Sequence, residues 1–251
     1  MSSFMQPATV ERLLAVNREF YRTVAEHFDA TRQGWTPGHL AILPYFETGA
    51  KQTPISVLDV GCGNGRLARL LADQGIACRY TGVDNDAHLL HLATEAVDPL
   101  LGIDARFVRA DLSAADWAAP LHEEQFDVVL CLATVQHLPG YAMRRRLFED
   151  FRRLSRRWAI LSFWQFLTSP RFVAKQIDWA EVGLTAADVE PGDALLPWQQ
   201  GVRAVRYVHQ IDAAEVARLA ADTGWRVHDL FRADGKEGDL NLYTVLEAEQ
   251  N

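Results

Sequence analysis

The segment Val57-Leu-Asp-Val-Gly-Cys-Gly-Asn-Gly65 decides the fold of this chain. Its apolar first half predicts a short buried strand, and its glycines predict a loop that leads into a helix at Arg66. Because glycine has no Cβ, such a loop lets the backbone approach a ligand and exposes N–H groups at a helix N-terminus. The segment matches a GxGxxG dinucleotide fingerprint poorly, and Asp59 inside the strand is unusual for a dinucleotide site.

Strand and helix patterns alternate on the C-terminal side of this segment. We expect strands over residues 56–60, 78–83, 105–109, 126–133, 158–163, 225–232 and 241–247, and helices over 66–74, 87–97, 144–154 and up to 222 after an N-cap at Asp212. Gly235 and Gly238 permit a turn between the last two strands. The pattern predicts a doubly wound α/β fold: a mostly parallel seven-stranded sheet that closes with an antiparallel hairpin.

Two flanking regions complete a predicted single domain over residues 1–251. Residues 1–50 form an N-terminal helical cap, with one or two helices over 8–31 and another over 37–46. Residues 53–165 form the ligand-binding core. Residues 167–207 have no sustained period and are longer than an ordinary loop, so we expect a lid-like insertion on the substrate side.

Two further carboxylates follow the predicted strands at informative distances. Asp84 ends the second strand, nineteen positions after Gly65, and Asp111 follows the third strand. A carboxylate at Asp84 can accept hydrogen bonds from both ribose hydroxyls of an adenosine that lies across the strand ends. A carboxylate at Asp111 can accept from the adenine amino group. The spacing therefore predicts an adenosine-containing ligand.

These segments, in order along the chain, resemble the motifs of class I S-adenosylmethionine-dependent methyltransferases. The motifs are VLDVGCGNG (57–65), TGVDND (81–86), RADL (109–112) and FDVVLCLATVQHL (126–138). The resemblance implies S-adenosyl-L-methionine as the cofactor. It implies that Asp59 and the glycine loop hold the methionine end, Asp84 the ribose, and Asp111 with Leu112 the adenine, while Leu132 borders the methyl-transfer cleft. The implied cofactor-binding residues are Asp59, Gly61, Gly63, Gly65, Asp84, Asn85, Asp111, Leu112 and Leu132.

A narrower resemblance concerns the methyl acceptor. Residues 20–37, 193–198 and 206–209 are similar to segments of the methyltransferases that esterify 5-carboxymethyluridine at the tRNA wobble position. This resemblance implies tRNA as the substrate and, by analogy with eukaryotic relatives, a small zinc-containing activating partner. It suggests catalytic roles for His137, Arg206 and His209, and substrate contacts by Tyr21, Arg32, Trp198, Arg203 and Tyr207.

The chemistry expected of these residues is consistent with an anionic acceptor. Arg206 or Arg203 could bind a carboxylate through two parallel hydrogen bonds, and His137 or His209 could orient a neighbouring oxygen. Trp198 and Tyr207 could stack on a base, or could instead be packing residues of the lid. No set of residues has the spacing of a metal site.

Composition limits the alternatives. The chain has 251 residues and a formal net charge of −8, which disfavours general nucleic-acid binding. Seven arginines between residues 144 and 157 could form a local RNA-binding surface or a solvated helix face. The three cysteines lack paired spacing, the N-terminus lacks a secretory signal, and no apolar run reaches the ~18 residues that span a bilayer. We therefore expect a cytoplasmic protein that binds no membrane.

Three hypotheses about function stay open. The first is a wobble-uridine tRNA methyltransferase. The second is a methyltransferase that acts on a carboxyl, hydroxyl or amine group of a small molecule, for example an anionic metabolite. The third is a cofactor-binding regulator without turnover. The intact glycine loop and the two acids argue for cofactor binding in all three cases.

Overall fold

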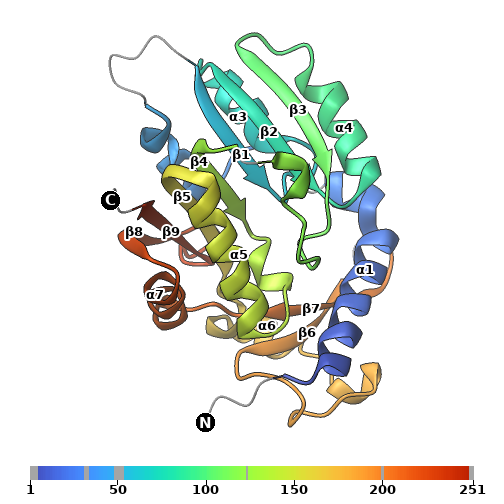
Figure 1. Cartoon of the computed structure of the whole chain (residues 1–251). Coiled ribbons are helices and arrows are strands. Elements are labelled where there is room, and N and C mark those ends of the chain that lie inside the picture. The colour runs from blue at the N-terminus through green and yellow to red at the C-terminus, as the bar shows by residue number, and fades with distance from the viewer. Residues whose placement is uncertain (1–4, 31–33, 48–53, 123, 199–200, 249–251) are drawn as a thin grey trace.

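The computed structural model describes residues 5–30, 34–47, 54–122, 124–198 and 201–248. A seven-stranded sheet in the order β3-β2-β1-β4-β5-β9-β8 forms its centre (Figure 1). The five strands that pair in parallel are β1 (Ile55–Val60), β2 (Cys78–Asp84), β3 (Ile103–Arg109), β4 (Phe126–Leu132) and β5 (Ser155–Trp164). The hairpin β8 (Trp225–Ala233) and β9 (Asn241–Ala248) adds to β5 in antiparallel orientation. The predicted fold class is confirmed.

Helices cover both faces of the sheet because consecutive strand residues point to opposite sides. Val57 lies on one face, in a core with residues of α3 (Arg66–Asp73) and α4 (Ala87–Val97) and with residues 42–46, which follow α2 (Pro37–Ala41). Leu58 packs against the other face, in a core with residues of α5 (Tyr141–Leu154) and α7 (Ala213–Asp222). Asp212 caps α7, as its spacing predicts, by accepting a hydrogen bond from the N–H of Glu215 at 2.9 Å. None of the helices in the described part of the chain is long and apolar enough to cross a membrane.

The cover of the sheet's carboxyl end departs from the prediction. Residues 167–207 are expected to be irregular, but they contain most of a two-stranded antiparallel sheet, β6 (Asp193–Trp198) and β7 (Ala204–His209). Short helical turns precede it: η4 (Phe166–Thr168), α6 (Pro170–Val173) and η5 (Trp179–Val182). In β6, Leu195 packs with Leu13 of the N-terminal helix, whereas Leu196 packs with Trp164 at the end of β5. Because both faces of this small sheet are buried, its sequence shows no alternation that would predict a strand.

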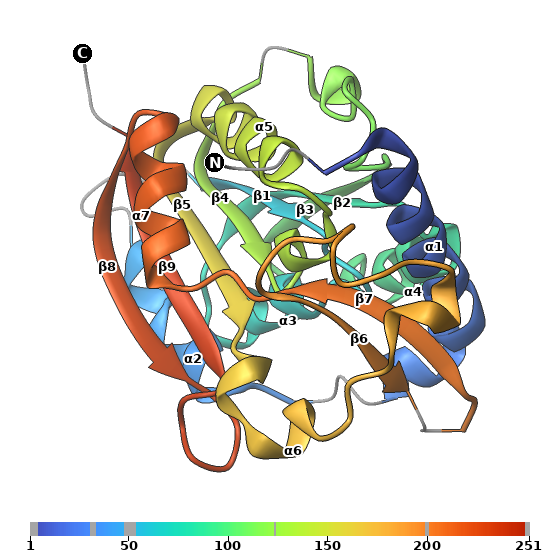
Figure 2. The same ribbon diagram turned by 90° about the horizontal axis from the view of Figure 1, so that it is seen from below.

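The N-terminal cap consists of one long helix, α1 (Pro7–Ala30), followed by α2 and the 3₁₀ turn η1 (Leu43–Phe46). The single helix expected over 37–46 is therefore wrong: it is divided at Ile42, and Pro44, which lacks an N–H, lies within the second turn. The arrowheads of the parallel strands point toward β6 and β7 (Figure 1), and these two strands lie in front of the sheet in the view from below (Figure 2). Since α1 packs on β7, the two elements together cover the carboxyl ends of the strands.

Candidate active site

The glycine loop connects β1 to α3, and the first residue of the loop, Gly61, has a backbone position that no other residue type fits. Gly61 has a φ of 79°, and a Cβ there would lie 2.3 Å from the Thr134 hydroxyl oxygen. Gly65, with a φ of 70°, is the N-cap of α3. The loop therefore passes close to the segment after β4 and presents the N-terminal turn of α3 to the carboxyl end of the sheet.

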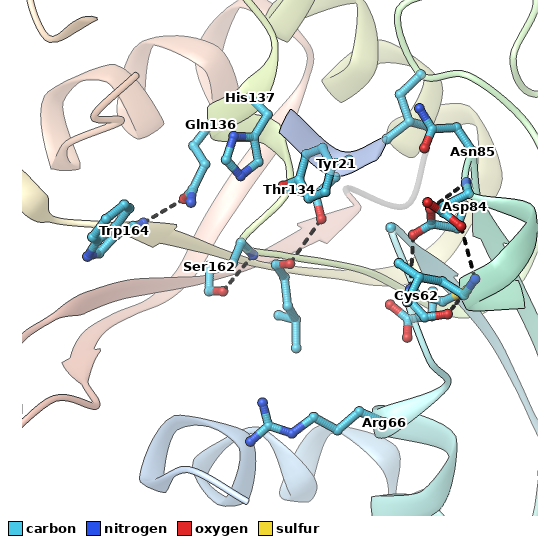
Figure 3. A pocket seen from close by; sticks show the side chains of 18 of the residues that line it. Tyr21, Cys62, Arg66, Asp84, Asn85, Thr134, Gln136, His137, Ser162 and Trp164 are labelled. Carbon is cyan, nitrogen blue, oxygen red and sulfur yellow. Dashed lines mark hydrogen bonds between the residues drawn. The ribbon is translucent and has the colours of Figure 1, made fainter. Parts of the chain in front are cut away.

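Asp84 joins the loop to the end of β2. Its carboxylate accepts hydrogen bonds from the N–H of Gly63 at 3.0 Å and from the N–H of Asp86 at 3.0 Å (Figure 3). Burial raises the pKa of Asp84, although these backbone hydrogen bonds oppose the shift. A buried carboxylate is thus held in a fixed orientation at the position where the sequence predicts a ribose ligand.

Asp59 is the second buried carboxylate of this region. It is 4% exposed and accepts a hydrogen bond from the Tyr80 hydroxyl. Burial raises the pKa of Asp59 to about 7; the hydrogen bond from Tyr80 opposes this shift and the negative charge of Asp84 adds to it. The side chain therefore changes its charge within the physiological pH range.

A cavity of about 540 Å³ opens at the carboxyl ends of β1, β2 and β4 and continues beneath the cover. Twelve of the predicted site residues line it: Tyr21, Asp59, Gly61, Gly63, Asp84, Asn85, Asp111, Leu112, Leu132, His137, Trp198 and Arg206. Gly65 does not line the cavity, because it lies behind the loop, where a Cβ would touch Ala93 and Val97 of α4. The cavity volume is of the size that holds small-molecule ligands and cofactors.

The end of the cavity beneath β7 is lined by aromatic rings and by Arg206. The Arg206 guanidinium carbon lies 4.5 Å from the ring centroid of Trp164 and 5.6 Å from that of Phe20. Trp198 packs edge-on against Phe20, with 6.0 Å between the ring centroids. Cation–π contact with two rings restrains the Arg206 side chain while its charge remains at the cavity wall.

His137 lies between the two ends of the cavity, in the 3₁₀ turn η3 (Val135–His137). Its Nδ1 lies 3.2 Å from the carbonyl oxygen of Tyr207, and its ring meets the ring of Tyr21 edge-on at 5.6 Å (Figure 3 shows the two rings). A carbonyl oxygen can only accept, so Nδ1 carries the proton, and Nε2 of the neutral ring is an acceptor.

Several polar residues that line the cavity were missing from the sequence prediction, and Asn17, Gln136 and Ser162 are three of them. Asn17 donates to the His137 carbonyl at 3.0 Å and accepts from the Tyr207 N–H at 2.9 Å. Gln136 accepts from the Trp164 N–H at 2.7 Å, and Ser162 accepts from the Ala133 N–H at 3.0 Å. A signal for Asn17 exists, because it is a polar residue in the apolar stripe that includes Leu13, Phe20 and Val24. Gln136 and Ser162 have no comparable signal.

Three predicted acceptor-site residues do not line the cavity, and Arg32 lies outside the described residues. His209 is 2% exposed, and its two ring nitrogens lie 2.7 Å from Asp193 and 2.8 Å from Glu215. The fully buried Tyr207 donates its hydroxyl proton to Asp193 at 2.7 Å, so its ring cannot stack on a substrate base. Arg203 is exposed outside the cavity. The structure therefore places His209, expected to be catalytic, and Tyr207 and Arg203, expected to contact the substrate, outside the cavity.

The arginine-rich segment also contains an unexpected buried charge. Arg144 is 1% exposed and forms ion pairs with Glu190 at 2.7 Å and with Glu215 at 2.8 Å. Its charge is compensated inside the protein, so this arginine can belong neither to an RNA-binding surface nor to a solvated helix face. Oxygens of Glu190 and Asp193 converge with a His209 nitrogen within 4.8 Å, as a metal site would require, but these atoms already interact with Arg144, Tyr207 and one another.

Comparison with known proteins agrees with this site. The family described as "Methyltransferase domain" matches residues 57–157. A ubiquinone biosynthesis O-methyltransferase of Thiobacillus denitrificans is 31% identical over 189 residues, which cover 75% of this chain and 72% of that protein. A trans-aconitate 2-methyltransferase of Streptomyces avermitilis is 32% identical over 97 residues, covering 39% of this chain and 35% of that protein.

A solved structure extends the similarity to the fold. The magnesium protoporphyrin IX methyltransferase of Synechocystis with bound S-adenosylhomocysteine has a TM-score of 0.64 at 18% identity, covering 95% of this chain and 100% of that one. The chain spans 28% to 55% of the length of the first four curated relatives that it matches. With the glycine loop and its acids at the carboxyl ends of the parallel strands, the chain belongs to the class I S-adenosylmethionine-dependent methyltransferases and uses S-adenosyl-L-methionine as its cofactor.

Proposed function

We propose that this protein, acting as one catalytic unit over residues 1–251, methylates a hydroxyl oxygen of a small molecule that also has an anionic group. The observation that supports this most directly is the single cavity that joins Asp84, at the end of β2, to Arg206 beneath the cover. A volume of about 540 Å³ suits a cofactor together with part of a small acceptor. The similarity to O-methyltransferases also supports transfer to oxygen.

The residues present fit the cofactor. Asp84 would accept from the ribose hydroxyls, and Asp111, with Asn85 and Leu112 beside it, would bind the adenine end. Asp59 and the glycine loop would hold the methionine end, and Leu132 would border the reacting methyl group. S-adenosylmethionine supplies an electrophilic methyl group on a sulfonium sulfur.

Two residues would act on the acceptor. His137 is hydrogen-bonded through Nδ1 to the Tyr207 carbonyl, so Nε2 would take the proton from the acceptor hydroxyl as the oxygen attacks. Arg206, restrained by Trp164 and Phe20, would bind the anionic group. Trp198 and Tyr21, at the same end of the cavity, would contact the apolar part of the acceptor. Catalysis would then consist of positioning and proton transfer.

The tRNA hypothesis has less support than the small-molecule hypothesis. His209 and Tyr207, on which the narrower resemblance partly rested, lie outside the cavity, and so does Arg203. Arg144, the first arginine of the basic segment, is buried. An activating partner protein was inferred only from that resemblance, and we do not include one in the proposed function.

Transfer of labelled methyl groups tests the proposal. The purified protein is incubated with labelled cofactor and three acceptor sets: hydroxylated carboxylic acids, the methyl esters of the same acids, and total tRNA. Labelling of the hydroxyl oxygen in the free acids, with little labelling of the esters, is expected. Equal labelling of acids and esters would remove the anion requirement, and preferential labelling of tRNA would overturn the proposed substrate class.

A further inference from the structure

A buried charge network joins the cover to the core beside the cavity. It includes Arg144 of α5, Asp193 of β6, His209 of β7, Glu215 of α7, and Glu190 in the loop before β6. The side chains of Arg144, Asp193 and His209 are at most 2% exposed. Within the described residues, the ion pairs Arg144–Glu190 and His209–Glu215 link the small sheet and the loop before it to helices α5 and α7.

His209 is the cationic centre of this network. Both ring nitrogens face carboxylates, which accept hydrogen bonds, so both nitrogens carry protons. Burial opposes the charged form, but the hydrogen bonds to Asp193 and Glu215 outweigh it and raise the pKa of His209. The other charged or titratable groups around it are Arg144, Glu190 and Tyr207. Two cations and three carboxylates therefore balance each other to within one charge.

The network reaches the turn that bears His137 at two points. Arg144 donates from Nη1 to the Leu138 carbonyl at 3.3 Å, directly after His137. On the other side, Asp193 accepts from the Tyr207 hydroxyl at 2.7 Å, and the carbonyl of the same tyrosine lies 3.2 Å from Nδ1 of His137. Tyr207 thus connects the buried charges to the imidazole in the cavity through its own backbone.

We propose that the charge network around His209 is a positioning device for His137, and that it acts by fixing the Tyr207 carbonyl that holds the proton on Nδ1. This inference rests on the proposed role of His137 as the base. If the carbonyl moved away, the neutral imidazole could carry its proton on Nε2, where it could not accept the acceptor's proton. His209 therefore affects the reaction without touching substrate, which explains why a histidine with motif-like spacing lies outside the cavity.

The tautomer of His137 is the direct readout. In protein labelled with ¹⁵N-histidine, the imidazole nitrogens of His137 are assigned by comparison with His137→Gln, and their chemical shifts are measured in Tyr207→Phe and His209→Gln. Tyr207→Phe removes one oxygen from the network and leaves both Arg144 ion pairs intact, so it serves if His209→Gln does not fold. We expect wild-type His137 to hold its proton on Nδ1 and both variants to show a mixture with the Nε2 form.

Kinetics and a matched control complete the test. Tyr45→Phe removes a hydroxyl that donates to Asp229 at 3.1 Å, outside the cavity. We expect Tyr207→Phe to lower kcat about tenfold, a part of the 10²–10⁴ that a positioned base contributes, with unchanged cofactor affinity. Tyr45→Phe should change neither kcat nor the tautomer.

The tautomer and turnover results distinguish this proposal from the proposed function. Unchanged His137 shifts in both network variants would overturn the positioning role, whatever their turnover. A shifted tautomer together with wild-type kcat would overturn the link between orientation and catalysis. If no hydroxylated acid is methylated by the wild type, the proposed function fails, while the NMR measurement still decides whether the network orients His137.

Discussion

The cofactor end of the cavity and its cover are built in different ways. At the cofactor end, Gly63 and Asp84 are 21 positions apart in the chain and belong to adjacent strand–loop units. In the cover, Asn17 bonds to Tyr207 across 190 positions, and Arg12 to the Val182 carbonyl across 170. The cofactor end depends on backbone geometry encoded locally. The cover depends on long-range contacts and on charges that compensate one another inside the protein.

This difference assigns different tasks to the two regions. A loop fixed by backbone hydrogen bonds can bind the same cofactor in many relatives. The position of a cover that is attached through buried ion pairs depends on the full set of partners, because a lost partner leaves an uncompensated charge. Changes in the cover should therefore affect stability and acceptor chemistry, whereas changes at the cofactor end should affect cofactor affinity.

The largest effect is expected where the cover loses its buried cation. Arg144→Met removes the guanidinium that pairs with both Glu190 and Glu215, and should lower the free energy of unfolding by about 3–5 kcal/mol. Urea denaturation measures this. Arg145→Met is the matched control on the same helix, because the Arg145 side chain is 46% exposed and its ion pair with Glu149 lies at the surface; it should change stability by under about 0.5 kcal/mol. Equal losses in the two variants would show that the network does not anchor the cover.

Cofactor binding should be the next most sensitive property, and it tests the other region. Asp84→Ala removes the acceptor expected for the ribose hydroxyls and should weaken S-adenosylhomocysteine binding by about 2–4 kcal/mol. Calorimetry measures the affinity. Asp104→Ala, an exposed aspartate on β3 outside the cavity, should bind as the wild type does. Wild-type affinity in Asp84→Ala would mean that the loop alone holds the cofactor.

The charge of Asp59 gives a smaller, pH-dependent effect at the same end. Its pKa of about 7 means that the carboxylate is mostly protonated at pH 6 and mostly ionised at pH 8. If Asp59 binds the ammonium group at the methionine end, affinity should rise about tenfold between these pH values, since only the ionised carboxylate attracts that cation. Titrations at pH 6, 7 and 8 measure this, and Asp59→Asn should bind weakly with no such dependence. A wild-type affinity that does not change with pH would show that Asp59 does not bind the cofactor.

The smallest expected effect is the change of protein stability with pH that the charged His209 in the cover produces. The folded pKa of His209 is raised above its ordinary value, so its stabilising contribution is complete below about pH 6.5 and is lost as pH rises through the folded pKa. Melting temperatures should therefore fall more steeply above pH 6.5 in the wild type than in His209→Gln. Asp59 also makes stability depend on pH, but its contribution is the same in the wild type and in His209→Gln, so it cancels in the comparison. Parallel curves would contradict the charged state of His209.

Much of the cofactor end could be predicted from the sequence because its determinants are local. Gly61 follows an apolar strand and needs a positive φ, and a carboxylate ends the next strand at Asp84. Strand periodicity and the carboxyl-end rule for parallel sheets then bring both to one edge. Gly65 was predicted to bind the cofactor because it belongs to the glycine motif, but it lies behind the loop, in contact with α4.

The cover was beyond sequence reasoning for two physical reasons. Both faces of β6 and β7 are buried, so hydrophobic alternation does not mark these strands. Similarly, the segment Arg206-Tyr207-Val208-His209 has the same sequence whether His209 faces a cavity or a pair of carboxylates.

By itself, the sequence determined the sheet, its order of elements and a cofactor loop with its acids. Only the tertiary structure decided which side chains face the acceptor. Leu195 and Tyr207 turn toward the N-terminal helix, Arg206 lies against Trp164, and His209 points to charges from three other elements. Burial and charge compensation are set by partners far apart in the chain, and no local pattern encodes such partners.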